Sequence, residues 1–550
     1  MSAPPALPVP ARLLERARNT PDASLCVVPE RALPGGRPVK GHPGWWRITV
    51  GQAALQLAQV ADALEAMGVT AGARVAVLAN ASHTWAVVDL AIQALGAVTV
   101  GLSKDLHPDE LRRRVALTQP RLLVTDQPVD VDLPQVAMPG SPGPQLPEPP
   151  TPSLAGLAER LSRVSPEQPA TLAFTAGTTR CARAAVLTHM ALHQAVKAGR
   201  TAFGAGQGDR SVVALPMDHI HQRFATYAGT DRGIEGWYPR GVEHLPETFR
   251  AARPTLLVAS PVVLEDIQVA ARTRAVERGF GSLYDWACRQ RQGRTGWRAR
   301  AERELADHMV FRRIRRGLGG QLRTIVAGGA PLERELAAWF QRIGVPVRNG
   351  WGLVETGAPL TASPPIGVPG SVGRPLPGVQ LRTSVTGELH VRSPTLMDRY
   401  HDDPQATADA FTEDGWLRTG DLGTVDAAGW VHLHGRVTNR VAGPQGIDLD
   451  QIDAQLRAPG GRTTVTCRAQ DGPGLTTFAF RRHSGASVPS PIVLRQRIQA
   501  WNAGRPPEQT IHGLAIVDHP LTAMSGTCTP TRAPVRREIR VRYQDEVRPL

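Results

Sequence analysis

Short apolar runs alternate with longer amphipathic segments along most of the chain. The runs that predict strands are Arg74–Leu78, Arg121–Thr125, Val212–Leu215 and Leu256–Ala259. From Gln52 to Met67 the apolar positions instead recur at the spacing of a helix. Strands that alternate with helices are typical of α/β proteins with mainly parallel sheets.

The pattern changes after Arg436, where the stretch Gly435–Gly446 is typical of a linker. We therefore expect a large N-terminal domain, residues 1–437, of mainly parallel sheets packed with helices. A small α+β domain is expected to follow it, over residues 438–550. The proline-rich segment Pro134–Pro152 predicts a surface connection without a catalytic role.

Between Val269 and Leu322 the chain is predicted to be helical and is rich in arginine. The aromatic and apolar residues interleaved with these arginines include Trp286, Trp297, Phe311 and Ile314. One interpretation is a solvated charged face on helices that pack against a core. The alternative is a patch that contacts an anionic membrane surface.

The formal net charge of the 550-residue chain is +14. The basic residues are almost all arginine and are spread along the sequence, so compositional bias explains the charge better than a nucleic-acid surface does. The last lysine is Lys197, which follows Lys40 and Lys104.

The five cysteines are scattered and form no C-x-x-C pair, which argues against a disulfide framework or a zinc site. The prolines near the N-terminus argue against a signal peptide, and no apolar run reaches the roughly 18 residues of a membrane span. We therefore expect a cytoplasmic protein that is soluble or at most peripheral to a membrane.

Hydroxyl side chains and a glycine crowd the segment Phe174–His189, ahead of an apolar run. Such a loop can wrap phosphate oxygens with backbone N–H groups and short hydroxyls, with a cation beside them to offset the charge. The candidate residues are Thr175, Thr178, Thr179 and Arg183. An ordinary connection between a strand and a helix explains the loop equally well when it is taken alone.

Further segments follow in a fixed order, namely Gly328–Leu332, Asn349–Thr356 and Gly415–Gly423, the last of them ahead of Arg436. Together with the Phe174–His189 loop they resemble the acyl-adenylate-forming superfamily, and within it the long-chain fatty acyl-CoA synthetases. The likeness runs from about Ala11 to Tyr543, and it includes Leu215–Arg223 and Met397–Tyr400. It implies an AMP-forming ligase that uses ATP, Mg²⁺ and CoA to activate a fatty acid or related carboxylate.

The resemblance also implies roles for particular residues. Glu355 would be catalytic and would bind magnesium, and Trp351 would stack on adenine. Asp421 would accept hydrogen bonds from the ribose hydroxyls, with Arg436 at the same sugar. The rest of the implied nucleotide-binding set is Gly328, Gly329, Ala330, Asn349, Gly350 and Gly352. His219 would lie on the acyl side of the site, although a structural role is the alternative for a lone histidine.

The chain departs from the family pattern at several positions. Residues that replace the family's own are Arg180, Ala182, Arg183 and Ala184 in the phosphate loop, Val354 before the glutamate, and Asn439 at the hinge. The turn on the CoA side is reduced to Gly443–Gly446. Ala533 stands where the family has its adenylation lysine, and the adjacent Arg532 is the candidate substitute cation.

Three hypotheses follow. The first is a working acyl-CoA ligase. The second is an altered ligase that uses another acceptor or a preformed adenylate. The third is a non-catalytic nucleotide- or acyl-binding regulatory protein, which the lost phosphate contacts favour. Retention of Glu355, Asp421 and Arg436 argues for an enzyme, because a scaffold needs neither a metal ligand nor groups that hold a ribose.

Overall fold

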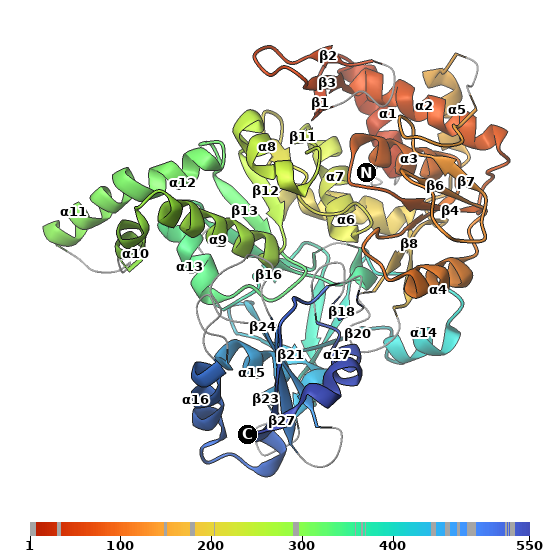
Figure 1. The fold of residues 1–550 in the computed structure, drawn as a ribbon. Coiled ribbons are helices and arrows are strands. Elements are labelled where there is room, and N and C mark those ends of the chain that lie inside the picture. Colours follow the sequence, from red (N-terminus) through yellow and green to blue (C-terminus); the bar gives the residue numbers. More distant parts are fainter. Residues whose placement is uncertain are drawn as a thin grey trace.

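The structure is a computed structural model. It describes residues 7–29, 35–147, 151–175, 182–202, 204–289, 296–357, 359–364, 367–368, 370–441, 447–456, 463–469, 474–480, 491–522, 525, 527–528 and 534–550. The predicted α/β class is confirmed, since two large sheets with parallel centres are packed with helices (Figure 1).

The first large sheet has seven strands. In spatial order they are β19 (Arg399–Tyr400), β9 (Ala184–Thr188), β8 (Pro169–Phe174), β5 (Val98–Gly101), β4 (Arg74–Leu78), β6 (Leu122–Thr125) and β7 (Gln135–Ala137). The strands from β8 to β7 are parallel, whereas β9 runs antiparallel to both of its neighbours. The segment Pro134–Pro152 therefore does more than connect, because its first residues include the edge strand β7.

The second large sheet has ten strands. In spatial order they are β16 (Arg374–Pro375), β15 (Thr361–Ala362), β14 (Val347–Trp351), β13 (Thr324–Ala327), β12 (Leu256–Ala259), β10 (Arg210–Val212), β11 (Glu235–Trp237), β1 (Ser24–Val28), β3 (Trp46–Thr49) and β2 (Arg37–Pro38). The strands from β14 to β1 are parallel, and those at both edges are antiparallel.

Helices pack between the two large sheets. The set comprises α1 (Val9–Asn19), α2 (Val50–Ala66), α3 (His83–Ala94), α5 (Leu154–Ser162), α6 (His189–Ala202) and α7 (Ile220–Arg232). All 12 residues of α3 are buried, and one core cluster joins it to Cys26 of β1 and Val75 of β4. Burial on every side explains why α3 is apolar almost all round. On the far face of the first sheet, α4 (Pro108–Thr118) packs near β5 and β6.

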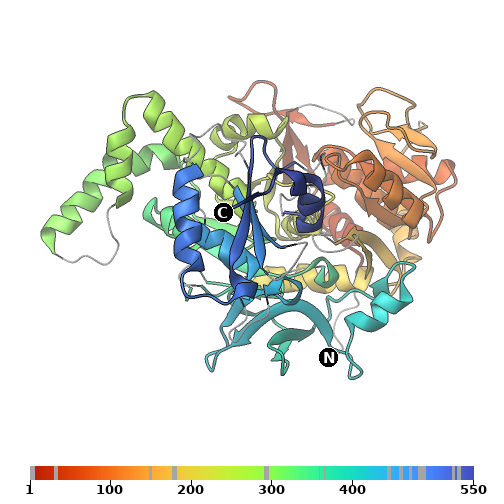
Figure 2. The ribbon, with the colours of Figure 1, turned by 60° about the horizontal axis from the view of Figure 1, so that its bottom comes forward.

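A group of helices projects from the second sheet, and both views show it standing away from the rest of the molecule (Figures 1 and 2). We call it the helical arm. It consists of α9 (Pro261–Glu277), α10 (Gly281–Arg289), α11 (Trp297–Ala306), the π-helical turn η2 (Asp307–Phe311) and α12 (Arg312–Gly317). At its base lie η1 (Val242–His244), α8 (Leu245–Ala252) and α13 (Arg334–Arg342). The helices predicted from Val269 are thus confirmed, but the first begins at Pro261.

An antiparallel sheet follows along the chain. It consists of β17 (Gln380–Thr383), β18 (Glu388–Arg392), β20 (Leu417–Val425) and β21 (Val431–Arg436), with α14 (Pro404–Ala410) beside β19 and β20. The predicted linker does not begin at Gly435, because Gly435 and Arg436 belong to β21. The next residues form the 3-10 turn η4 (Val437–Asn439) and β22 (Arg440–Val441).

The C-terminal part has a sheet and core clusters of its own. Its elements are β23 (Ile447–Asp448), α15 (Leu449–Leu456), β24 (Thr463–Arg468), β25 (Leu475–Phe480), α16 (Pro491–Asn502), η5 (Pro507–Gln509), β26 (Ile511–Val517), α17 (Arg536–Tyr543), η6 (Gln544–Glu546) and β27 (Arg548–Pro549). The boundary at 437/438 stays a prediction. None of the helices in the described ranges is long and apolar enough to cross a lipid bilayer.

Candidate active site

The strands β8 and β9 form a hairpin that holds the two ends of the predicted phosphate loop. The N–H of Thr175 donates to the carbonyl of Arg183 over 2.8 Å, and the N–H of Arg183 donates to Thr175 Oγ1 over 3.0 Å. These two predicted residues therefore meet at the neck of the loop. Thr178 and Thr179 lie outside the described residues, as do Arg180 and the C-terminal pair Arg532 and Ala533.

The guanidinium of Arg183 lies beside two residues that precede or begin α14. Its Nε is 3.2 Å from Asp403 Oδ2, and its Cζ lies 5.4 Å from the centre of the Tyr400 ring. Asp403 also caps α14 by accepting a hydrogen bond from the N–H of Ala406. The cation that replaces the family lysine is thus already held by a carboxylate and an aromatic face.

Glu355 lies in the 3-10 turn η3 (Val354–Thr356), close to the same tyrosine. The hydroxyl of Tyr400 donates to Glu355 Oε1 over 2.7 Å, and the N–H of Met397 donates to the Glu355 carbonyl over 2.7 Å. Burial raises the pKa of Tyr400 and the neighbouring Glu355 raises it further, which keeps the phenol protonated as the donor.

The donor set at Glu355 fits Mg²⁺ that arrives with a nucleotide. No cluster of three or more His, Cys, Asp or Glu side chains suited to a metal was found among the described residues. Magnesium is commonly held by one or two carboxylates together with substrate phosphates and water, so a single glutamate beside a phosphate loop suits it. Tyr400 holds the Glu355 carboxylate through a single hydrogen bond, which leaves further lone pairs of the carboxylate for such an ion.

The predicted adenine surface is formed where β13 and β14 end side by side, with Ala327 in register with Asn349. A Cβ on Gly328 would lie 3.2 Å from the Gly350 carbonyl, so this close approach of two backbones favours glycine. Gly329 has a φ of +84°, which also favours glycine. The Asn349 N–H is bonded to Ser363 Oγ over 2.6 Å, which fixes β14 against the next strand segment.

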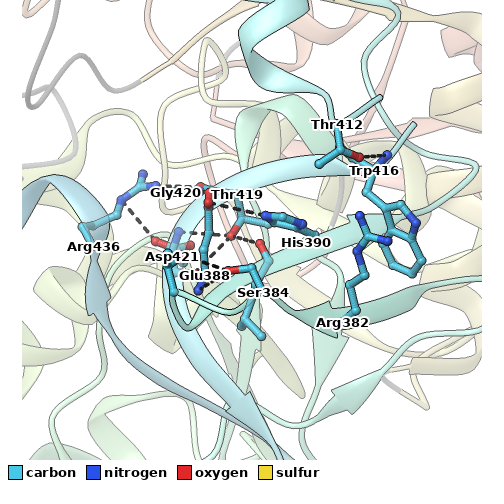
Figure 3. A network of polar contacts seen from close by, with 12 residues as sticks. Arg382, Ser384, Glu388, His390, Thr412, Trp416, Thr419, Gly420, Asp421 and Arg436 are labelled. Carbon is cyan, nitrogen blue, oxygen red and sulfur yellow. Dashed lines mark hydrogen bonds and ion pairs between the residues drawn. The ribbon is translucent and has the colours of Figure 1, made fainter. Parts of the chain in front are cut away.

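Trp351 of β14 and Arg436 of β21 both contact Asp421 of β20. The indole Nε1 of Trp351 donates to Asp421 Oδ2 over 2.7 Å, and Arg436 Nε lies 3.2 Å from Asp421 Oδ1. Figure 3 shows Arg436 and Asp421 facing each other across the two strands. Arg436 is fixed further by a 3.0 Å bond from Nη1 to the Thr419 carbonyl. Three predicted site residues thus form one polar unit.

The Asp421 carboxylate is buried, which raises its pKa, while Arg436 and the Trp351 N–H act to lower it. Glu355 and Glu388 raise the pKa slightly further through their negative charges. A buried carboxylate with a single cationic partner is stabilised by additional donors. Ribose hydroxyls are donors of the right kind for this position.

A cavity of about 1130 Å³ adjoins this region. Its lining includes Gly328–Ala330 and Gly350–Gly352, and it continues between α7 and the helical arm along mainly apolar side chains. His219 lines the cavity next to Gly329, and its role on the acyl side stays a prediction. Its Nδ1 lies 3.3 Å from that of His221. Burial and the neighbouring His221 lower the pKa of His219 to about 3, so the ring is neutral at pH 7.

Three residues of this site were not assigned from the sequence. Tyr400 belongs to a segment that carried the family resemblance, but its bond to Glu355 spans 45 positions of sequence and leaves no local pattern. Asp403 precedes a proline at the start of α14, so the sequence predicts a helix cap there and does not predict the contact with Arg183. Glu388 Oε1 accepts the N–H of Gly420 over 2.9 Å and so fixes the part of β20 that carries Asp421 (Figure 3).

The fold is that of solved adenylate-forming ligases. The chain superposes with a TM-score of 0.73 on the anthranilate CoA ligase AuaEII in complex with anthranoyl-AMP, at 18% identity and with 98% of each chain covered. It superposes with a TM-score of 0.68 on the O-succinylbenzoate Coenzyme A synthetase MenE of Bacillus subtilis in complex with ATP and magnesium, at 17% identity over 96% of this chain and 98% of that one.

Sequence comparison gives the family. Residues 14–401 match the AMP-binding enzyme family. The chain is also 30% identical over 480 residues to the long-chain-fatty-acid–CoA ligase FadD15 of Mycobacterium tuberculosis, a match that covers 82% of this chain and 78% of that protein. The chain therefore belongs to the AMP-binding enzyme family, and the expected resemblance to fatty acyl-CoA synthetases is confirmed.

Proposed function

We propose that this protein is an AMP-forming acyl-CoA ligase that acts on a fatty acid or a related apolar carboxylate. In the first half-reaction a carboxylate oxygen attacks the α-phosphorus of ATP, which gives acyl-AMP and pyrophosphate. In the second, the CoA thiol takes the acyl group and AMP leaves. The observation that carries the proposal is continuity: the glycine-lined adenine surface and His219 line the same large apolar cavity. A nucleotide and a long acyl chain can therefore meet there.

The proposed reaction gives each contact of the site a role. The bond to Asp421 fixes the edge of the Trp351 ring and leaves a face for adenine to stack on. Asp421 and Arg436 hold the ribose. Mg²⁺ supplies positive charge at the phosphates when it is bound, and Glu355, held by Tyr400, is the residue that would bind it. Thr175, together with Thr178 and Thr179, would donate to the phosphate oxygens.

His219 is placed to contact the acyl carboxylate or the adenylate. Its ring stacks near that of His221, with 5.0 Å between ring centres, and the short contact between the two Nδ1 atoms requires one donor and one acceptor. Two neutral rings meet this requirement, whereas two imidazolium ions do not. We therefore assign His219 a hydrogen-bonding role and not that of a cation.

The cation that contacts the α-phosphate during adenylation can be tested by mutation. Lysine is absent at Ala533, and we propose that the Arg532 guanidinium contacts the α-phosphate instead. Arg183 is less suited, because Asp403 already lies against it. Arg532→Ala is expected to lower acyl-AMP formation by about a hundredfold or more while ATP still binds. Arg537→Ala, an exposed neighbour, is the matched control and should stay within about twofold.

The deciding experiment is mass spectrometry of products after incubation with ATP, Mg²⁺, CoA and fatty acids of graded length. Acyl-CoA together with AMP supports the proposal. Acyl-AMP without acyl-CoA indicates a different acceptor. An absence of both products with every acid, while nucleotide still binds, overturns the proposal in favour of a nucleotide- or acyl-binding regulatory protein.

A further inference from the structure

A second cavity lies at the end of the ten-stranded sheet where the parallel strands begin. Its lining includes Arg210, Glu235 and Ser24, which are the first residues of β10, β11 and β1. The nucleotide site is built at the other end of this sheet, where β13 and β14 finish. Figure 1 shows β1, β2 and β3 at the top of the molecule, far from the C-terminal elements at the bottom. We call this second cavity the amino-end groove.

The amino-end groove has the size of a small-molecule site. Its volume is about 680 Å³, within the roughly 300–1,000 Å³ of ligand pockets. One wall is the segment between β2 and β3, with Lys40 and His42, and the other is the end of α8, with Arg253. The ring of His42 stands edge-on to that of Trp237, with 6.2 Å between ring centres. A small organic molecule would therefore meet both rings and cations in this groove.

More basic than acidic side chains line the groove. Five basic and two acidic side chains give the lining a formal charge of +3 when His42 is neutral. The basic residues are Arg16, Lys40, Arg47, Arg210 and Arg253, and the acidic residues are Asp209 and Glu235.

Both acids are already paired with cations. Arg323, which does not line the groove, holds Asp209 with Nη2 at 2.7 Å and 2.6 Å from the two carboxylate oxygens. Glu235 lies 3.4 Å from Arg47 Nε and accepts the indole N–H of Trp237 over 2.8 Å. The acids therefore do little to offset the other cations of the groove.

Three of these cations have no carboxylate partner within the described ranges of the chain, namely Lys40, Arg210 and Arg253. Arg210 Nε donates to the Ala252 carbonyl over 2.8 Å, and its Nη2 donates to the Arg253 carbonyl over 3.0 Å, at the end of α8. These neutral acceptors hold the guanidinium in place without cancelling its charge. A positive group that is fixed in advance loses little conformational entropy when an anion binds.

We propose that the amino-end groove binds a small molecule that carries a diphosphate group. Guanidinium and ammonium groups both pair well with phosphate oxygens. One phosphate monoester brings only about 1.5 to 2 negative charges at pH 7, so two phosphates match three cations better than one does. The proposal does not rest on the proposed ligase function, because the groove takes part in no step of that reaction.

Lysine acetylation of the full chain, followed by mass spectrometry, tests occupancy of the groove itself. The chain has three lysines, Lys40, Lys104 and Lys197, so Lys40 is easily followed. Lys197 is exposed on α6 and does not line the groove, which makes it the internal control. With inorganic pyrophosphate or ADP, and without Mg²⁺, we expect Lys40 to react about fivefold more slowly and Lys197 to change by less than about twofold.

A pair of matched variants tests the contribution of the groove cations. Arg253→Gln should raise the ligand concentration that half-protects Lys40 by about tenfold, because a charge-assisted contact is lost. Arg163→Gln, at an exposed position outside the groove, should stay within about twofold of the wild type. Thermal unfolding at the wild-type temperature shows that both variants are folded. The proposal is overturned if the two variants need the same concentration.

Asp421→Asn separates the groove from the nucleotide site. An unchanged half-protecting concentration in this variant supports a separate site, whereas a raised concentration shows that the ligand acts from the nucleotide site and overturns the proposal. Sodium chloride at the same ionic strength is the control for screening, and equal protection of Lys40 by this salt also overturns it.

The two probes distinguish two sources of the diphosphate group. Protection of Lys40 by pyrophosphate as well as by ADP assigns the groove to the diphosphate group itself. Protection by ADP but not by pyrophosphate shows that the nucleoside is recognised too, and either result supports the proposal. Lys40 that reacts at an unchanged rate with both probes at millimolar concentration overturns it.

Discussion

The indole nitrogen of Trp351 donates a 2.7 Å hydrogen bond to the buried carboxylate of Asp421. The bond joins the residue assigned to adenine with the residue assigned to ribose, so the two halves of the nucleoside site hold each other in position. A phenylalanine in place of Trp351 would still stack on adenine but would not donate this bond. The indole therefore ties the orientation of Asp421 to the adenine surface.

Asp421→Asn is expected to weaken ATP binding about tenfold or more. The change keeps the shape of the side chain but converts charge-assisted bonds to the ribose into neutral ones, a loss of roughly 1–2 kcal/mol. Isothermal titration calorimetry measures the dissociation constant. Asp130→Asn, at an exposed and distant position, is the control and should bind ATP like the wild type. Unchanged affinity in Asp421→Asn would remove Asp421 from the nucleotide site.

Tyr400→Phe is expected to raise the Mg²⁺ concentration required for nucleotide binding by about tenfold, because Glu355 loses the hydroxyl that orients it. The measurement is a magnesium titration of the binding of a fluorescent ATP analogue. Tyr543→Phe is the matched control, since its hydroxyl bonds to His519 in the C-terminal part. If both variants show the wild-type magnesium requirement, Tyr400 does not position Glu355.

Asp89→Ala should strongly destabilise the protein. Arg223 Nη2 lies 2.7 Å from Asp89 Oδ1 and both side chains are fully buried, so removal of the carboxylate leaves a buried cation without its partner. We expect the free energy of unfolding to fall by about 3–5 kcal/mol, as measured in urea. Asp109→Ala, which breaks the exposed pair with Arg112, should cost about 1 kcal/mol or less. A small effect at Asp89 would show that the interior readily hydrates Arg223.

His83 is expected to make the fold sensitive to acid. Its Nε2 lies 2.7 Å from Gln56 Oε1 and its Nδ1 lies 3.4 Å from the Cys26 thiol, and burial lowers its pKa to about 4. Between that value and the unfolded value of about 6.5, the unfolded chain binds the additional proton, so stability falls as the pH drops through this range.

The His83 contribution is present in full above about pH 6.5 and is lost progressively down to about pH 4, at a cost of up to roughly 3 kcal/mol. Denaturant unfolding at pH 7 and pH 4.5 should therefore show a smaller difference for His83→Gln than for the wild type. His434→Gln, at an exposed histidine, should keep the wild-type difference. If the free energy of unfolding depends on pH equally in all three proteins, His83 is not a source of the acid sensitivity.

The strands that the sequence predicted best are those with apolar residues on both faces. Arg74–Leu78 and Leu256–Ala259 have the predicted bounds, because parallel strands covered by helices must be apolar throughout. The predicted strand Val212–Leu215 is displaced, and β10 is Arg210–Val212. From Val213 the chain bonds across to the Trp237 carbonyl and then turns towards the cavity, so apolar residues there line a site instead of extending a strand.

The candidate site could be predicted only as far as its motifs extend. Motif order placed Trp351, Asp421 and Arg436 in one site, and in the structure Trp351 and Arg436 both contact Asp421. The bond from Tyr400 to Glu355 and the pairing of Arg183 with Asp403 depend on how β19 lies against β9, which sequence spacing does not encode. The roles of these residues stay predictions until they are measured.

The central claim is that a nucleotide held by Trp351, Asp421 and Glu355 reacts with a carboxylate in the adjoining cavity. Exchange of labelled pyrophosphate into ATP, with Mg²⁺ and a fatty acid but without CoA, measures that step alone. The account predicts exchange that requires the fatty acid and falls at least a hundredfold in Glu355→Gln. The account is contradicted if the wild-type protein binds ATP but, with every acid tested, shows no more exchange than Glu355→Gln.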